Sequence, residues 1–216
     1  MTVRKTLATI LFSILVTLSI GVQGAMAQTT TSGSSQEARV VDETNLDTQL
    51  YLLVATNQEI DDTRLPPALD SVVKQLRASL PFKNYKLIST LVNRVKNEGR
   101  LSLKWVGGPL PASAAASPNT PSFNEFKVNQ LKLVTDSGGR QLVRMDGFVF
   151  GARIPIVTGT AIAANGPAAP IFNYEQTGLN TDISIREGEP VVVGTLNVGP
   201  SGDAIILVMS AKRANK

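Results

Sequence analysis

The clearest structural signal in the sequence is TDISIREGEPVVVGTLNVGPSGDAIILVMSA, which spans residues 181–211. Polar and apolar residues alternate from Thr181 to Arg186, and apolar, largely β-branched residues dominate 191–196 and 204–208. Glycine, proline and acidic residues separate these runs, as is typical of turns between strands. The stretch therefore predicts strand, turn, strand, turn and strand, a closing hairpin that completes a β core.

Residues 66–80 predict the principal helix of the chain. Pro66 and Pro67 stand where a helix can begin, because the first turn does not use the N–H that proline lacks. Helical periodicity gathers one set of apolar residues on a single face: Leu69, Val72, Val73, Leu76 and Leu80. Pro81 ends the helix. We expect the apolar face of the helix to cover a sheet.

Strands are expected on both sides of this helix. Residues 49–55 form a short apolar run that is typical of a buried strand. Residues 84–92 and 101–106 also have the composition of strands, and the turn at 97–100 predicts that these two form a hairpin. Residues 49–106 therefore predict a small α+β unit in which one helix covers a sheet.

The second half of the chain predicts strands and no helix. Residues 126–134 and 141–157 flank the turn Asp136–Gly139 and predict an antiparallel hairpin. Residues 159–170 are small and contain glycine and proline, which predicts a loop or an irregular excursion. Residues 171–178 lead into the closing strands. The predicted fold class is α+β, a mostly antiparallel β-sheet with one principal amphipathic helix.

The N-terminus predicts export. Arg4 and Lys5 precede an apolar run over 6–22, and the small residues Ala25 and Ala27 fit cleavage after Ala27. The run is near the lower length that spans a bilayer, so a retained anchor is the alternative. Cleavage would leave no transmembrane helix in the mature chain, which would be periplasmic or associated with the outer membrane.

Composition divides the chain into five expected segments. They are a signal peptide (1–27), a disordered polar linker (28–45), a small α+β unit (46–108), a Pro/Ala-rich loop or linker (109–122) and an antiparallel β region (123–213). Both the division of 46–108 and 123–213 into two domains and their union in one domain are compatible with this composition.

Cysteine and histidine are absent from the sequence. Their absence excludes thiol nucleophiles, thiolate metal sites, histidine-based catalytic triads and histidine-ligated zinc. The charge balance is nearly even: removal of Arg4 and Lys5 with the signal peptide leaves 19 Lys and Arg against 17 Asp and Glu, a net charge of +2. No concentrated basic surface is indicated, and we expect no nucleic-acid partner.

Several polar motifs could carry chemistry, but each is better explained by structure. Asp61-Asp62 lacks the ligand spacing of a metal loop and suits the N-terminus of the following helix. Glu187 and Glu189 lie in one turn, whereas catalytic carboxylates must face each other across a substrate. The glycine turns 136–139 and 199–203 precede strands, whereas a phosphate cradle requires a following helix.

Base stacking by aromatic residues among cations is the remaining chemical hypothesis. Only Lys83-Asn84-Tyr85-Lys86 has this character locally. We expect this motif to have no such role in an exported protein. The sequence therefore predicts no catalytic residues, no cofactor-binding residues, no metal ligands, no cofactor and no enzyme activity.

The closing stretch resembles the membrane-proximal β region of secretins, the ring-forming outer-membrane channels of type II and type IV pilus secretion systems. The matching residues are Thr181, Ile183, Ile185, Gly188, Glu189, Val191, Val192, Val193, Gly194 and Leu196. Thr195 departs from the pattern, because the family usually has a second glycine there. Residues 204–211 stand where secretins have their next apolar strand, and residues 49–106 look like their small α+β periplasmic modules.

The resemblance implies a non-enzymatic exported protein of the cell envelope, a secretin-like component or accessory of a secretion or pilus system. Such a protein would act through contacts between surface strands, with envelope proteins or with further copies of itself. The alternative is a periplasmic carrier domain that holds a small apolar ligand between helix and sheet. A carboxylate-based hydrolase is a third hypothesis and would require two acids that face each other across a cleft.

Overall fold

A computed structural model describes residues 43–59, 65–107, 120–161, 168–198 and 202–215. The signal peptide, most of the polar linker, Asp61-Asp62 and most of the loop expected at 109–122 lie outside the described residues. Residues 41–216 form one compact unit, and all that follows concerns this unit.

The described residues contain a short helical region and eight strands. The helical region is a 3₁₀ turn (η1, Pro67–Leu69) followed by α1 (Asp70–Ser79). The strands are β1 (Asn45–Thr56), β2 (Asn84–Lys96), β3 (Gly99–Gly107), β4 (Ser122–Thr135), β5 (Gln141–Ala161), β6 (Ala169–Arg186), β7 (Val191–Val198) and β8 (Asp203–Arg213). The prediction of a mostly antiparallel β protein with one principal helix is confirmed for the described residues, although α1 is short.

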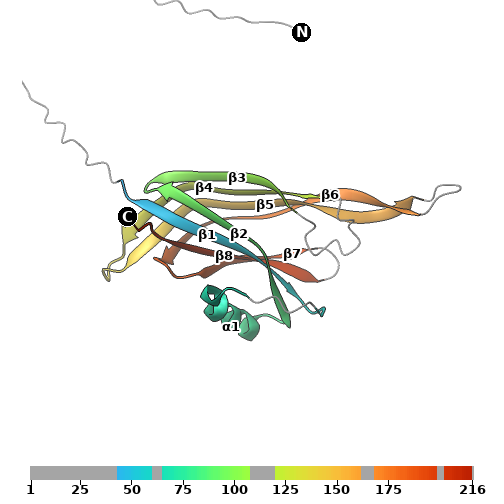
Figure 1. Cartoon of the computed structure of the whole chain (residues 1–216), viewed down its shortest axis with the longest axis horizontal. Coiled ribbons are helices and arrows are strands. Elements are labelled where there is room, and N and C mark those ends of the chain that lie inside the picture. The colour runs from blue at the N-terminus through green and yellow to red at the C-terminus, as the bar shows by residue number, and fades with distance from the viewer. Residues whose placement is uncertain (1–42, 60–64, 108–119, 162–167, 199–201, 216) are drawn as a thin grey trace, which may run out of the picture. The chain divides into compact units, whose positions relative to one another are not determined.

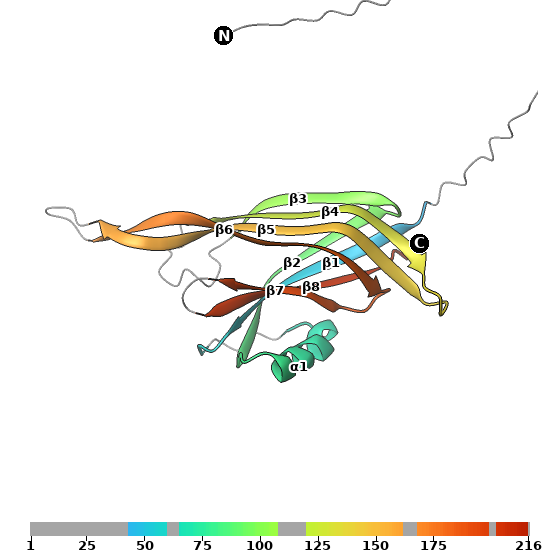
Figure 2. The ribbon, with the colours of Figure 1, turned by 180° about the vertical axis from the view of Figure 1, so that it is seen from behind.

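The strands form two antiparallel four-stranded sheets. Sheet A has the order β2-β1-β8-β7, and sheet B has the order β3-β4-β5-β6. Figures 1 and 2 show sheet A between sheet B on one side and α1 on the other. Among the described strands, each pairing joins neighbours in the chain, apart from the pairing of β1 with β8 at the centre of sheet A.

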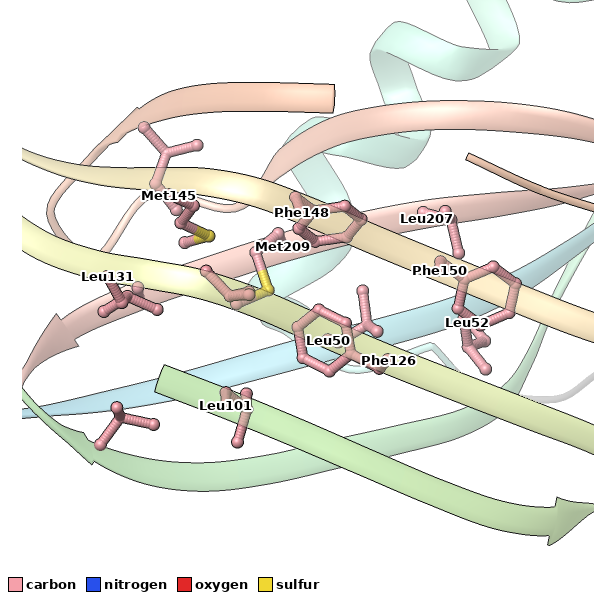
Figure 3. Packing of buried hydrophobic residues seen from close by; sticks show 14 of the residues in the cluster. Leu50, Leu52, Leu101, Phe126, Leu131, Met145, Phe148, Phe150, Leu207 and Met209 are labelled. Carbon is pink, nitrogen blue, oxygen red and sulfur yellow. The ribbon is translucent and has the colours of Figure 1, made fainter. Parts of the chain in front are cut away.

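A hydrophobic core fills the space between the two sheets. Its largest side chains are the phenylalanines Phe126, Phe148 and Phe150 of sheet B, all at most 1% exposed. Leu50 and Leu52 of β1 approach them from sheet A (Figure 3). Because sheet B buries only its inner face, its strands alternate between buried and exposed residues, as period-two patterning requires.

A second core lies between sheet A and α1. Val72, Val73 and Leu76 of α1 pack there with side chains of β1, β2 and β8. The central strands β1 and β8 are therefore covered on both faces, which explains their long runs of consecutive buried residues. The amphipathic helix predicted at 66–80, and its role in covering a sheet, are confirmed.

Two predicted strand pairings are wrong, at two corners of the fold. The turn after β2 does not close a hairpin, because β2 pairs with β1 in sheet A whereas β3 pairs with β4 in sheet B. The turn between β6 and β7 likewise connects the two sheets, although the strands predicted within 181–211 are present. Alternating apolar residues indicate a strand, but they do not indicate which sheet receives it.

The hairpin predicted from residues 126–134 and 141–157 is confirmed as β4 and β5. The loop expected at 159–170 is shorter than predicted, because β5 continues to Ala161 and β6 begins at Ala169. These ends pair with each other, with Thr160 opposite Pro170. The result is a two-stranded extension of sheet B, visible in Figure 1 beyond β3 and β4.

Candidate strand-edge interface

The acidic turn at the end of β6 is a structural clamp. The Glu187 carboxylate accepts hydrogen bonds from the Arg213 backbone N–H at 2.9 Å and from its guanidinium at 2.9 and 3.0 Å. These bonds to Arg213 hold the pKa of Glu187 below its usual value. Glu189 instead lies 3.6 Å from Arg186 on the surface. The two carboxylates therefore engage different partners within the fold.

The other polar motifs also have structural partners. Asp136 accepts backbone N–H bonds from Gly138 and Arg140, both at 2.9 Å, and closes the β4–β5 turn. Tyr85, the aromatic residue of the Lys83–Lys86 motif, is buried under α1 and cannot stack on a base. Of the glycine turn at 199–203, the described residues are Gly202, with a φ of 73°, and Asp203, the first residue of β8.

No chemical centre emerges from the described part of the chain. Its Asp and Glu side chains form no group of three that could hold a metal ion. Two surface depressions, of about 340 and 540 Å³, are lined by residues of sheet B and lie away from the contact between α1 and sheet A. None of the described helices has the length and apolar character needed to cross a bilayer.

The feature that remains is a set of four strand edges. In the described residues, β2 and β7 each have one pairing partner in sheet A, and β3 and β6 each have one in sheet B. The short turns place β2 beside β3 on one flank of the sandwich and β6 beside β7 on the other. Each flank thus presents two strands whose outward N–H and C=O groups can pair with another chain.

The core between the two sheets is incompletely buried along these flanks. The hydrophobic residues that pack against the inter-sheet core but remain only partly buried are Leu91, Leu103, Trp105, Leu133, Leu179, Ile183, Val191, Val193 and Leu196. All except Leu133 belong to the four edge strands. Their inward faces reach the core while their flanks remain open to solvent, so a neighbouring chain at either edge would complete their burial.

Strand direction allows the two flanks to meet. Each sheet has four strands that alternate in direction, so its two edge strands run in opposite directions. If a second copy is placed beside the first in the same orientation, β6 lies antiparallel to the neighbour's β3, and β7 lies antiparallel to its β2. Such a head-to-tail contact repeats from copy to copy and can close into a ring.

The outer face of sheet B carries apolar side chains near its extended end. Val106 of β3 and Phe123 of β4 are 65% and 44% exposed, and Tyr174 of β6 packs beside Phe123. Val106 and Phe123 line the smaller of the two depressions. Sequence analysis did not identify this group, because its members are brought together only by the register of three strands.

No protein-family model and no curated protein matches this chain. Secretins are among the solved structures that resemble it, in agreement with the resemblance seen in the sequence. Two are structures of the secretin InvG from the Salmonella SPI-1 type III secretion injectisome, with TM-scores of 0.35 and 0.38 and identities of 10% and 8%. They cover 80% and 83% of this chain, and 64% and 63% of their own chains are matched.

A further similar structure is the type IV competence pilus secretin PilQ of V. cholerae, with a TM-score of 0.32 and 10% identity. The match covers 80% of this chain and 59% of PilQ. The present chain therefore spans about three fifths of the length of the secretin chains it matches.

Proposed function

We propose that this protein is a non-enzymatic, secretin-like component of the bacterial cell envelope that assembles with further copies of itself through its strand edges. Export would follow from the signal peptide at 1–27. The observation that carries the proposal is the unfinished core on both flanks: the partly buried apolar residues lie almost entirely on β2, β3, β6 and β7. A monomer leaves these residues incompletely covered, whereas edge-to-edge assembly covers them in every copy except those at an open end.

The pairing would join β6 of one copy to β3 of the next, and β7 to β2. Backbone hydrogen bonds would supply affinity, and the partly buried side chains would supply register. Leu179 and Ile183 of β6 and Leu103 and Trp105 of β3 face the same core layer, so their side chains would meet across the new contact.

The first test is the mass of the full chain, expressed in a bacterium and purified from the envelope fraction. Light scattering and native mass spectrometry should give a defined multiple of the protomer mass. A protein that stays monomeric at every concentration, in the presence and absence of detergent, would overturn the proposal.

A pair of proline substitutions sharpens this test. Of two successive residues in an antiparallel edge strand, one directs its N–H to its partner and the other directs it outward. Asn180→Pro and Thr181→Pro in β6 therefore remove one N–H of each kind. We expect one variant to lose the β5–β6 ladder bond and unfold at lower temperature, and the other to keep its fold and lose assembly. Edge pairing would be contradicted if both proline variants folded and assembled like the wild type.

A further inference from the structure

Sheet B changes from four strands to two at a single row of residues. The last pair between β4 and β5 is Phe123 with Arg153. Beyond it, residues 154–161 of β5 pair, among the described residues, only with residues 169–175 of β6. We call this two-stranded part the ribbon. An isolated two-stranded ribbon is marginally stable, and its unpaired edges invite further strands.

Prolines stand on both sides of the place where pairing stops. If the register of β4 and β5 were continued by two rows, Pro121 would lie opposite Pro155. Neither residue has an N–H, so neither can donate a ladder hydrogen bond to the other. Pro155 pairs with Tyr174 on its other side. A paired proline must direct its nitrogen away from its partner strand, which here means toward the side where β4 would continue.

Tyr174 of β6, the pairing partner of Pro155, reaches across β5 to Pro121. Its hydroxyl donates a hydrogen bond to the Pro121 carbonyl at 3.1 Å, and therefore satisfies an acceptor that a strand N–H would otherwise occupy. Its ring packs on Phe123, with centroids 5.6 Å apart, and the Arg153 guanidinium lies 5.8 Å from the ring centroid. Pro155 is buried in this corner. These contacts join the base of the ribbon to the start of β4.

We propose that Pro121, Pro155 and Tyr174 form a pairing stop, which ends sheet B at the Phe123–Arg153 row and keeps the ribbon two-stranded. The two prolines withhold the donors that a continuing ladder needs, and the tyrosine hydroxyl occupies one of the two acceptors, the Pro121 carbonyl. The stop divides β6 into two parts. Residues 176–186 lie at the edge of the four-stranded part of sheet B, whereas residues 169–175 belong to the ribbon.

This separation has a consequence for assembly, which rests on the function proposed above. A neighbouring copy would pair along residues 176–186 of β6, where the half-buried Leu179 and Ile183 lie. The stop would prevent strands from adding to the β5 side of the ribbon. Residues 156–161 there are uncharged and rich in β-branched residues, a composition that favours unwanted strand addition.

The hydroxyl of Tyr174 can be tested alone, on dilute protein in which assembly plays no part. Tyr174→Phe keeps the ring contacts with Phe123 and Arg153 and removes only the hydrogen bond to Pro121. We expect amide hydrogen exchange to accelerate several-fold, up to about tenfold, over 169–175, because one hydrogen bond of modest net strength is lost. Tyr85→Phe is the matched control, since the buried Tyr85 hydroxyl has no hydrogen-bond partner among the described residues. Equal exchange in wild type and both variants would overturn the role of Tyr174.

The prolines are tested by restoring a donor. Pro155→Val supplies the missing N–H in a residue that favours strands, and Pro81→Val is the control at an exposed bend outside both sheets. We expect Pro155→Val to gain mass with increasing concentration beyond that of wild type, and its amides over 155–161 to gain protection in parallel. A variant that matches wild type and Pro81→Val in both measurements would overturn the pairing stop. That result would not contradict the proposed edge assembly, because assembly is tested separately by the mass of the wild-type protein.

Discussion

Glu187 joins three strands with one residue. Its carboxylate receives the side chain and backbone N–H of Arg213 at the end of β8, and its own N–H donates to the Gln141 carbonyl at the start of β5 at 3.3 Å. The side chain is mostly buried, at 21% exposure. Because β5 and β8 belong to different sheets, this residue fastens the two sheets at the corner where β6 passes into β7.

We predict that Glu187→Gln lowers the free energy of unfolding by about 1 kcal/mol at neutral pH, as expected for a partly buried charge-assisted pair. The pKa of Glu187 is depressed by Arg213 in the folded protein. A depressed carboxyl pKa stabilises above the unfolded-state pKa, and this stabilisation is lost as pH falls through the folded-state pKa. Denaturant titrations should therefore show the difference at pH 7 and a convergence of wild type and variant in acid, once the pH falls below the folded-state pKa of Glu187.

Glu189→Gln is the control for this prediction, because it neutralises a carboxylate two residues away in the same turn. Glu189 is largely exposed and meets Arg186 at 3.6 Å. Its loss should change the free energy of unfolding by less than about 0.5 kcal/mol. Equal effects of the two substitutions at pH 7 would refute the clamp.

The sequence correctly suggests that this turn serves structure, but it does not distinguish Glu187 from Glu189. Their difference depends on Arg213, a residue 26 positions away that reaches the corner only after β8 has joined sheet A. The same holds for Tyr174 and Pro121, 53 positions apart. Contacts of this kind follow from strand register, which a period-two pattern does not specify across different turns.

Among the elements, the β5–β6 pair contains two glycines that face each other, Gly151 and Gly178. A Cβ at Gly178 would lie 2.5 Å from the Phe150 carbonyl oxygen, whereas a Cβ at Gly151 would meet nothing within 4 Å. The two strands therefore approach closely at Gly178, and the lack of a side chain there is required by packing.

We predict that Gly178→Ala destabilises the protein by about 1–3 kcal/mol, because the new methyl group displaces backbone. Gly151→Ala should leave stability unchanged or raise it by up to about 1 kcal/mol, through a smaller loss of chain entropy on folding. Thermal unfolding followed by circular dichroism measures both. Similar stabilities for the two variants would show that β5 and β6 can separate at this point without cost.

Element type was more predictable than element pairing. The helix was recognisable because Leu69, Val72, Val73 and Leu76 repeat with the period of a helix and its ends carry prolines. The corners after β2 and β6 were mistaken for hairpins because a short turn between two strands usually closes one. The strand ends near Gly159 and Pro170 were mistaken for loop because glycine and proline usually interrupt strands, whereas here they stand on an edge.

For the molecule as a whole, the pairing of β1 with β8 is central, because both strands contribute to both cores. Residues 204–209 of β8 are fully buried and alternate between the two cores, with Ile205 and Leu207 facing sheet B and Ile206 and Val208 facing α1. Without β8, both cores lose their centre, and β1 keeps β2 as its only partner in sheet A.

We predict that a chain ending at residue 202 shows no cooperative thermal transition and aggregates, since it exposes the apolar faces of β1 and α1 together. A chain ending at Ala214 should unfold cooperatively like the full protein, because it retains β8 and the hydrogen bond from Ala214 to the Asn45 carbonyl. Calorimetry and light scattering on the two truncations make the comparison. A soluble, cooperatively folding protein that ends at residue 202 would refute the central role of β8.

The position of β8 in the sequence also affects the order in which the strands can pair. A ribosome releases the chain from its N-terminal side, so β1 emerges before β8, the strand with which it pairs at the centre of sheet A. Until β8 emerges, sheet A lacks the strand that lies between β1 and β7, so its four strands cannot all be paired. A product of interrupted synthesis never acquires the strand that completes both cores, and it stays open to proteases. The order of strands thus makes the completion of both cores depend on the synthesis of β8.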